Sequence, residues 1–157
     1  MNIGGIVYES LVDGEGIRNV IFTSGCVHGC KGCHNKKLWD FNYGEEFTLK
    51  KQMEFIEECK TNPLLDGITL SGGEPMLFPQ TLFLFIKEYK KANPNHTIWI
   101  YTGFTYEDCL KNEERTKLLS LCDVLVDGKF ESNKKDPSLK FRGSSNQRII
   151  NLKNSTK

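Results

Sequence analysis

Short apolar runs alternate with amphipathic stretches along most of this 157-residue chain. We expect strands at 19–23, 67–71, 96–101, 124–126 and 148–150. We expect helices at 48–60, from Pro79 to about 93, and as short pieces between 105 and 121. Two parallel strands need a long crossover, usually a helix, so this alternation predicts an α/β fold with a mainly parallel sheet. The strands are too few for a closed eight-stranded barrel, which leaves an open sheet or a partial (β/α) barrel.

Helical periodicity indicates which helix faces contact the core. The helix after Pro79 repeats apolar residues at i, i+3, i+4 and i+7, namely Leu82, Phe85, Ile86 and Tyr89. In the helix at 48–60, with Thr48 as the expected N-cap, the apolar residues roughly on one face are Leu49, Met53, Ile56 and Cys59. An apolar stripe of this kind normally packs against the protein interior, so we expect both faces to contact the sheet.

The unusual loops all follow strands. A loop rich in cysteine and glycine follows the first strand, and Ser-Gly-Gly-Glu-Pro at 71–75 follows the second. Thr102-Gly103 and Asp-Gly-Lys at 127–129 follow the third and fourth. The carboxyl ends of parallel strands meet at one edge of a sheet, where functional loops gather. The sequence therefore predicts one site built from these loops.

Three of the six cysteines, Cys26, Cys30 and Cys33, lie within eight residues in the pattern C-x3-C-x2-C. Closely spaced soft thiolates suit a zinc ion or an iron–sulfur cluster. A cubane cluster usually takes four cysteines, so three would leave one iron open to another ligand. A Cys3His zinc site completed by His28 or His34 remains an alternative, and so does a disulfide. We expect Cys59, Cys109 and Cys122 to be small buried hydrophobes.

Composition favours a soluble protein of the reducing cytosol. The net charge of +1 gives no case for nucleic-acid or membrane binding. No signal peptide or membrane-spanning run is visible, and we expect a cytoplasmic protein in which clustered cysteines bind metal. We expect a single domain over 1–157 that frays after about residue 150. From residue 129 onward there are eight Lys or Arg against two Asp or Glu, which indicates either a partner surface or a solvated face.

The cysteine motif followed by Gly72-Gly73-Glu74 resembles the radical S-adenosylmethionine (SAM) enzymes. Asp-Gly-Glu-Gly-Ile-Arg at 13–18 narrows the resemblance to the glycyl-radical-enzyme activases. Trp-Ile-Tyr-Thr-Gly at 99–103, Phe-Arg-Gly-Ser-Ser-Asn-Gln-Arg at 141–148 and the short length are similar to the branch that activates anaerobic ribonucleoside-triphosphate reductases. The likeness runs from about residue 6 to 150. An activase of another glycyl radical enzyme, such as pyruvate formate-lyase, and a non-enzymatic zinc or iron–sulfur module remain as alternatives.

The resemblance implies a radical SAM oxidoreductase. Cys26, Cys30 and Cys33 would hold a [4Fe–4S] cluster, and SAM would chelate the fourth iron. Reductive cleavage of SAM would give a 5′-deoxyadenosyl radical that takes a hydrogen from a glycine of the reductase. An electron donor such as flavodoxin or ferredoxin is implied, with no nucleic acid and no membrane as partner. No side chain beyond the cluster and SAM is expected to be catalytic. The expected SAM contacts are Gly32, Cys33, His34, Gly72, Gly73, Glu74 and Thr102.

Several residues have simpler interpretations. Gly32 stands where many relatives carry an aromatic residue, and His34 or Tyr101 could face the adenine instead. His28 is expected to be a loop residue, and Asp127 a cap or turn residue. Glu74 could instead be a carboxylate at a helix start. For Asp13 and Arg18 we weigh a turn with a surface ion pair against a role at the partner surface.

The cysteine motif generates the first prediction. Replacing one thiolate in Cys30→Ala is expected to abolish both the cluster and SAM cleavage, because two local thiolates cannot readily hold a cubane. Iron and sulfide assays on anaerobically reconstituted protein check the cluster. Undiminished SAM cleavage by this variant would refute the assignment.

Overall fold

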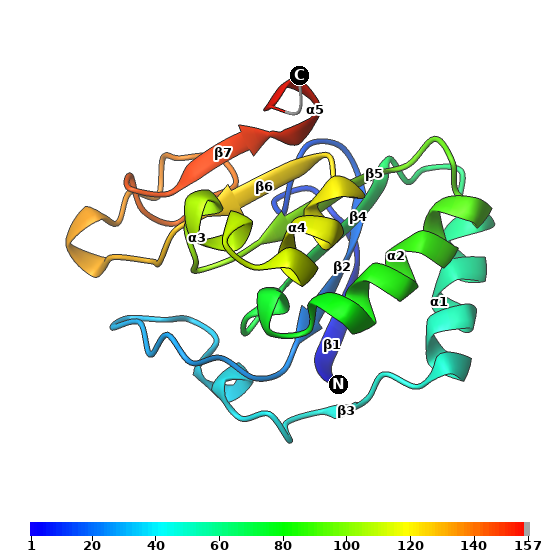
Figure 1. Cartoon of the computed structure of the whole chain (residues 1–157), viewed down its shortest axis with the longest axis horizontal. Helices are drawn as coiled ribbons and strands as arrows, with labels where there is room; N and C mark the ends of the chain where they lie inside the picture. Colours follow the sequence, from blue (N-terminus) through cyan, green and yellow to red (C-terminus); the bar gives the residue numbers. More distant parts are fainter. Residues whose placement is uncertain (156–157) are drawn as a thin grey trace.

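A computed structural model describes residues 1–155 as one mixed α/β layer structure (Figure 1). The strands are β1 (Asn2–Ser10), β2 (Arg18–Thr23), β3 (Glu45–Glu46), β4 (Gly67–Gly72), β5 (Thr97–Tyr101), β6 (Val124–Asp127) and β7 (Arg148–Asn151). The α-helices are α1 (Leu49–Lys60), α2 (Pro79–Ala92), α3 (Tyr106–Leu110), α4 (Glu113–Ser120) and α5 (Leu152–Ser155). Short 3-10 turns occur at η1 (Lys36–Trp39), η2 (Pro75–Leu77) and η3 (Ser132–Lys134).

The strands form one sheet in the order β3-β1-β2-β4-β5-β6-β7. The four central strands, β2, β4, β5 and β6, are parallel, and their registers pair Arg18 with Gly67 and Trp99 with Val124. Antiparallel strands extend the sheet on both sides. The prediction of an α/β fold whose mainly parallel sheet is open or forms a partial barrel is confirmed, since the four central strands are parallel and the order runs from β3 to β7 without closing.

The antiparallel strands correct the sequence interpretation. β1 was not expected, because its two adjacent glycines and exposed residues do not look like a buried strand. The strand predicted at 148–150 exists as β7, but it runs antiparallel to β6 because no crossover helix lies between them. The chain then continues as α5, whose Leu152 is buried, so it packs on the core beyond the position where fraying was expected. The last two residues, 156–157, lie outside the described part.

The helices pack on one face of the sheet and enclose the core (Figure 1). α2 buries Leu82, Phe85, Ile86 and Tyr89, as its periodicity predicts. For α1 the Thr48 cap is confirmed, since its side chain accepts from the Lys51 N–H at 3.2 Å. The prediction of its buried face is wrong in part. α1 buries Phe55 and Cys59, whereas Leu49 and Met53 are 76% and 70% exposed. The helix is rotated so that Phe55 meets the rings of Phe85 and Tyr89 on α2.

The opposite face of the sheet is covered by the loop at 11–17. A Cβ at Gly14 would lie 2.8 Å from the Trp99 ring and 2.9 Å from Arg18, so only glycine permits this approach. Trp99 is buried. The Asp13 carbonyl accepts from Thr69 Oγ1 at 2.7 Å and fixes the loop to β4. Gly14 is buried, whereas Leu11 and Val12 are 68% and 74% exposed, so only part of the loop packs against the sheet.

Arg18 is the polar centre of this face. Its guanidinium is 1% exposed and donates to Thr69 Oγ1, to Thr97 Oγ1 and to the carbonyls of Glu15, Ile68 and Thr97 at 2.6–3.0 Å. Burial lowers its pKa to about 10, so it remains a cation at neutral pH. The surface ion pair with Asp13, one of the two interpretations weighed for these residues, is wrong, because Arg18 is buried and Asp13 accepts from Ser10 Oγ instead.

Among the described residues, no helix combines the length and the apolar character needed to span a bilayer.

Arg18 generates a prediction about stability. Arg18→Met keeps the length of the side chain but removes the donor from buried acceptors on β4 and from Thr97 on β5. We expect the free energy of unfolding to fall by about 3 kcal/mol, measured by urea denaturation. The control Lys60→Met, on the exposed side of α1, should change it by no more than about 0.5 kcal/mol. Equal effects of the two substitutions would contradict the structural role of Arg18.

Candidate active site

The four loops at the carboxyl ends of the central strands surround one pocket of about 220 Å³. The prediction that they share one edge of the sheet is confirmed. The pocket is lined by Cys26, His28, Cys30, Cys33, His34, Asn35, Trp39, Ser71, Gly72, Gly73, Tyr101, Thr102, Gly103, Gly128, Lys129, Phe130, Gly143 and Gln147. Five of the seven expected SAM contacts, namely Cys33, His34, Gly72, Gly73 and Thr102, line the pocket, and so do the other two cysteines of the motif, Cys26 and Cys30. Glu74 lies behind the wall, and Gly32 precedes Cys33 in the loop.

The three cysteines of the motif are free thiols at intermediate exposure, unlike the buried Cys59, Cys109 and Cys122. Burial raises the pKa of Cys26 above its ordinary value. A bound metal cation would offset this, because metal ligation deprotonates a thiol. In residues 1–155, no three His, Cys, Asp or Glu side chains converge on a point that could hold a single metal ion. Three thiols from one short loop that line the same pocket are a donor set that fits an iron–sulfur cluster, which is held by cysteine thiolates.

Glycines let the loop at 71–75 lie directly against the start of the cysteine loop. Gly73 N–H donates to the Thr23 carbonyl at 3.0 Å, and Glu74 N–H donates to the Gly25 carbonyl at 2.8 Å. A Cβ at Gly73 would lie 2.5 Å from the Gly25 oxygen and 2.7 Å from the Leu38 oxygen. Only glycine fits between these backbone segments, and its own backbone remains in the pocket wall.

Glu74 joins three of the loops. Its side chain is fully buried, and Oε1 lies 2.7 Å from His28 Nε2, 2.6 Å from Thr102 Oγ1 and 2.7 Å from Gly103 N. Oε2 accepts from the Met76 N–H at 3.0 Å, which caps η2. Glu74 therefore is a carboxylate at the start of a 3-10 turn, and its contact with SAM stays a prediction. Thr102 serves the same network and also accepts from Phe104 N–H at 3.1 Å.

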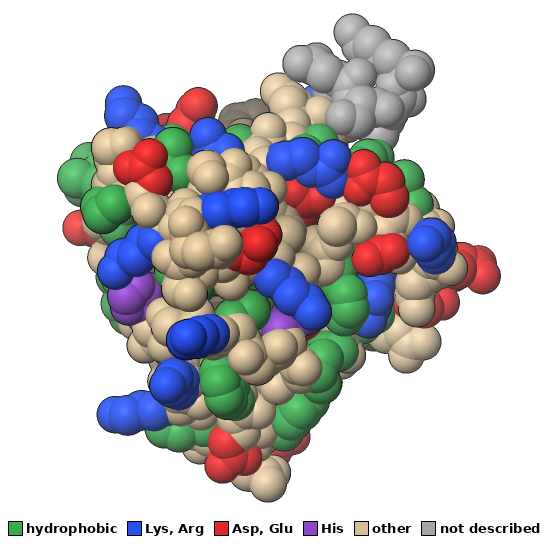
Figure 2. Space-filling model, turned by 90° about the vertical axis from the view of Figure 1, so that its left-hand side faces the viewer, with side chains coloured by type: hydrophobic (Ala, Val, Ile, Leu, Met, Phe, Trp, Pro, Cys, Tyr) green, Lys and Arg blue, Asp and Glu red, His purple; other side chains and the backbone are tan. Residues whose placement is uncertain are grey.

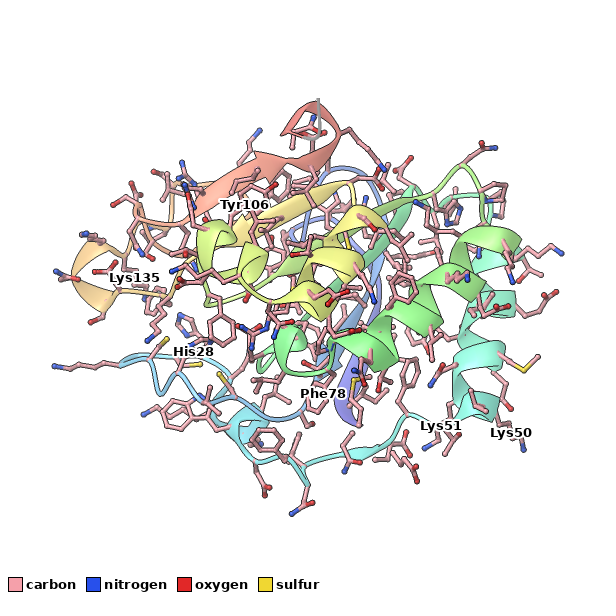
Figure 3. All side chains as sticks on the ribbon, in the orientation of Figure 1. His28, Lys50, Lys51, Phe78, Tyr106 and Lys135 are labelled. Atoms are coloured by element: carbon pink, nitrogen blue, oxygen red, sulfur yellow. The ribbon has the colours of Figure 1, made fainter. Side chains whose placement is uncertain are left out.

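His28 is more than a loop residue, contrary to expectation. Its side chain projects from the cysteine loop toward the sheet and is 5% exposed (Figure 3). The ring lies edge-on to Phe104, with centroids 4.6 Å apart. Its partner Glu74 is 46 residues away in the sequence, so no local pattern could reveal the contact.

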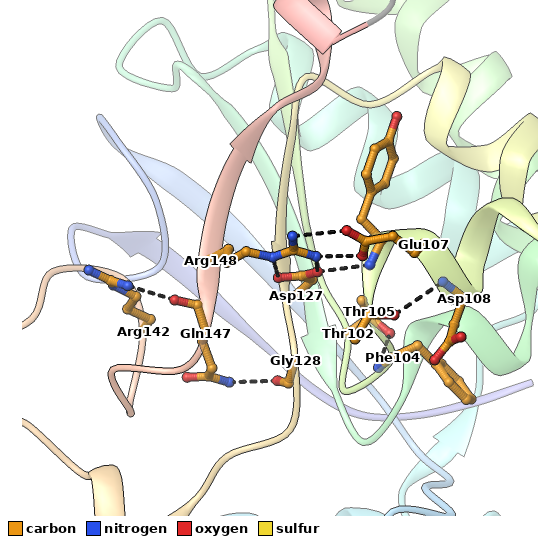
Figure 4. Close-up of polar contacts among 11 residues, drawn as sticks. Thr102, Phe104, Thr105, Glu107, Asp108, Asp127, Gly128, Arg142, Gln147 and Arg148 are labelled. Carbon is orange, nitrogen blue, oxygen red and sulfur yellow. Dashed lines mark hydrogen bonds and ion pairs between the residues drawn. The ribbon is translucent and has the colours of Figure 1, made fainter.

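The segment at 141–148 lines one side of the pocket with Gly143 and Gln147. Figure 4 shows polar contacts that hold this segment in place. Gln147 Nε2 donates to the Gly128 carbonyl at 2.9 Å, and Gly143 N–H donates to Gln147 Oε1 at 2.8 Å. Arg148 pairs with the buried Asp127 and with Glu107, and it lowers the pKa of Glu107 to about 2. Asp127 Oδ2 also accepts from the Tyr106 N–H at the start of α3. The N-cap of α3 is Thr105, so Asp127 is not its capping residue, but it accepts from the first N–H of the helix and also anchors β7.

Some lining residues were missed from the sequence. A Cβ at Gly32 would lie 3.4 Å from the Phe130 ring, and His34 lies 6.0 Å from the same ring. Phe130 thus brings an aromatic side chain to the place where Gly32 lacks one. Tyr101, a candidate for the adenine side, lines the pocket and donates from its hydroxyl to the Phe141 carbonyl at 2.6 Å. An aromatic residue directly after Asp-Gly-Lys was the available signal for Phe130.

Two kinds of comparison agree with this geometry. Residues 12–150 match the family described as a 4Fe-4S single cluster domain. The chain is 42% identical over 143 residues to the anaerobic ribonucleoside-triphosphate reductase-activating protein of Pasteurella multocida, covering 88% of this chain and 90% of the relative. The chain belongs to this activating-protein family.

Other members of the activating-protein family are similarly close. The Escherichia coli K12 protein of the same name is 40% identical over 147 residues, covering 91% of this chain and 94% of that protein. The protein of Enterobacteria phage T4 is 35% identical over 152 residues, covering 95% and 93%. Membership makes this a radical SAM enzyme with a [4Fe–4S] cluster. The zinc and disulfide alternatives for the cysteine motif are thereby set aside.

The contact between the two loops generates a third prediction. Gly73→Ala places a methyl group against two backbone oxygens, so we expect the loops to separate and the reconstituted protein to hold less iron. Iron and sulfide per chain provide the measurement. In the control Gly29→Ala the Cβ would meet no atom within 4 Å, and only the strain of φ +61° is added, about 1 kcal/mol. Full iron content in Gly73→Ala would show that the loops need not touch.

Proposed function

We propose that this protein, acting as a single domain, activates an anaerobic ribonucleoside-triphosphate reductase by generating a glycyl radical on it. The observation that carries the proposal is the joining of Cys26, Cys30 and Cys33 with Gly72 and Gly73 around one pocket. The relatives that match nearly their whole length carry this activity in their names. None of those named here is an activase of pyruvate formate-lyase, which favours the reductase as the partner.

The three cysteines would hold the cluster and leave one iron without a protein ligand. When bound, the cluster and SAM supply a one-electron cleavage of a sulfur–carbon bond, which yields methionine and a carbon radical able to take a hydrogen atom from glycine. The protein's part is to bind and orient. Gly72 and Gly73 would present backbone carbonyls to the SAM ammonium, and Gly32, Cys33 and His34 would lie on its adenine side.

The surroundings of Glu74 favour an indirect role in SAM binding over a direct contact. A buried carboxylate that already accepts several hydrogen bonds would act on SAM chiefly by fixing the backbone of the glycine loop. Its charge would still favour a nearby ammonium. Thr102 would contribute through the same network. No side chain of the pocket is proposed to react covalently.

The face that carries the pocket is rich in basic side chains (Figure 2). The exposed lysines of the cysteine loop and of the segment after β6 are Lys31, Lys36, Lys37, Lys129, Lys134, Lys135 and Lys140. A basic rim around a site favours acidic partner surfaces and speeds their encounter. This supports docking of the reductase here, together with a one-electron donor such as flavodoxin or ferredoxin.

Electron paramagnetic resonance tests the activity directly. Anaerobic protein with SAM and dithionite should produce a glycyl radical signal when mixed with the anaerobic reductase, and none with pyruvate formate-lyase. A signal only on pyruvate formate-lyase would move the protein to another branch of activases. If protein prepared anaerobically contained no iron or sulfide, the proposal would be refuted.

The basic rim generates a further prediction. Changing Lys134, Lys135 and Lys140 to Gln should weaken binding to the reductase on the order of tenfold at low ionic strength, and less at high salt. A matched triple change of Lys50, Lys60 and Lys87 on α1 and α2 removes the same charge far from the pocket and should have little effect. Figure 3 labels Lys135 and Lys50 on opposite sides of the molecule. Unchanged affinity after the first triple substitution would remove the docking idea.

A further inference from the structure

The cysteine loop is tied to the protein mainly at its ends. Gly25 N–H donates to the Leu38 carbonyl at 2.7 Å before the motif, and Cys33 N–H donates to Cys30 within it. In the described part of the chain, no backbone hydrogen bond joins residues 27–32 to a segment outside the loop. The loop would therefore be free to move relative to the pocket unless a side chain holds it.

His28 is the side chain that does so. Of the side chains at 27–32 in the described structure, it alone makes a hydrogen bond beyond the loop, from Nε2 to Glu74 Oε1 at 2.7 Å. Its ring is also confined sterically. Phe104 contacts it edge-on, and a Cβ at Gly103 would lie 2.5 Å from His28 Cδ2. The imidazole thus fills a site that is built for a ring.

The anchor for this contact belongs to the SAM side of the pocket. Glu74 directly follows Gly72 and Gly73, and Thr102 and Gly103 hold the same carboxylate oxygen. The position of Cys26 and Cys30 is thereby coupled to the position of the glycine backbone. Two sites that must engage one ligand together bind it more tightly when their separation is fixed beforehand.

We propose that His28 is a positioning residue that sets the cysteine loop against the glycine-rich loop, so that one SAM molecule can engage both. The inference rests on the function proposed above. In this role His28 contacts neither the cluster nor the sulfur–carbon bond of SAM that is cleaved. It acts through Glu74, in the way that the outer partners of metal ligands orient a site.

The test compares two substitutions that differ in the hydrogen bond. His28→Phe keeps a ring in the space beside Phe104 but has no polar atom, whereas His28→Gln retains an N–H donor. We expect His28→Phe to reconstitute with normal iron and sulfide, yet to raise the Kd for SAM roughly 10- to 100-fold. The Kd is read from the change that SAM causes in the paramagnetic resonance spectrum of the reduced cluster. His28→Gln should recover most of the affinity.

Two further variants complete the experiment: a control at the residue next to His28, and a substitution that disturbs the His28 contact from the opposite side. Val27→Ala changes an adjacent side chain that is 63% exposed and should leave the Kd unchanged. Gly103→Ala keeps the backbone N–H but pushes the imidazole away, so it should weaken SAM binding as His28→Phe does. Both substitutions break the same contact. In the double variant, their effects on the free energy of SAM binding should therefore be clearly less than additive.

The outcomes separate the alternatives. A His28→Phe protein with normal iron and a wild-type Kd for SAM would overturn the positioning role. Iron loss in His28→Phe combined with unaltered SAM binding in Gly103→Ala would also overturn it, and would assign His28 to cluster retention. A wild-type protein that binds no SAM would instead refute the proposed function, and this shows before any variant is made.

Discussion

The arrangement of the site depends on one buried carboxylate. Glu74 has no exposure to solvent, and a charge in that position is stable only if hydrogen-bond donors surround it. Oε1 accepts from Thr102 and Gly103 at the end of β5 and lies 2.7 Å from His28 Nε2 of the cysteine loop. Oε2 accepts from the Met76 N–H in η2. Satisfying the carboxylate therefore requires these segments to meet. The pocket forms as a consequence, with glycine backbone on one side and three thiols on another.

The sheet supplies the rigidity behind this network. The central parallel strands end at a common edge, so the loops that follow them start from fixed positions. At the other end, the buried guanidinium of Arg18 joins β2 to β4 and β5. The motif at 13–18 packs on the face of the sheet opposite the helices, where Gly14 lies against Trp99 and Arg18. Glu74 at the carboxyl ends of the parallel strands and Arg18 at their amino ends connect loops to the sheet. The helices cover the apolar face of the sheet.

Much of the fold was predictable because it depends on local signals. The periodicity of α2, the Thr48 cap and the apolar runs of β2, β4, β5 and β6 are set by neighbouring residues. The errors arose where a distant partner decides. β1 and the direction of β7 depend on which strand each one pairs with. The rotation of α1, which exposes Leu49 and Met53, depends on how Phe55 meets the rings of α2.

The same division applies to the site. The sequence by itself determined the soft thiolates at a cluster spacing, the glycines that permit close backbone approach, and the strand ends that bring them to one edge. Membership in the activating-protein family agrees with that set of donors. Only the tertiary structure decided that Glu74 faces inward, that His28 is its partner and that Phe130 lies beside Gly32. These contacts join residues that are far apart in the chain, and a side chain's partner across such a distance is fixed by packing, which no local pattern records.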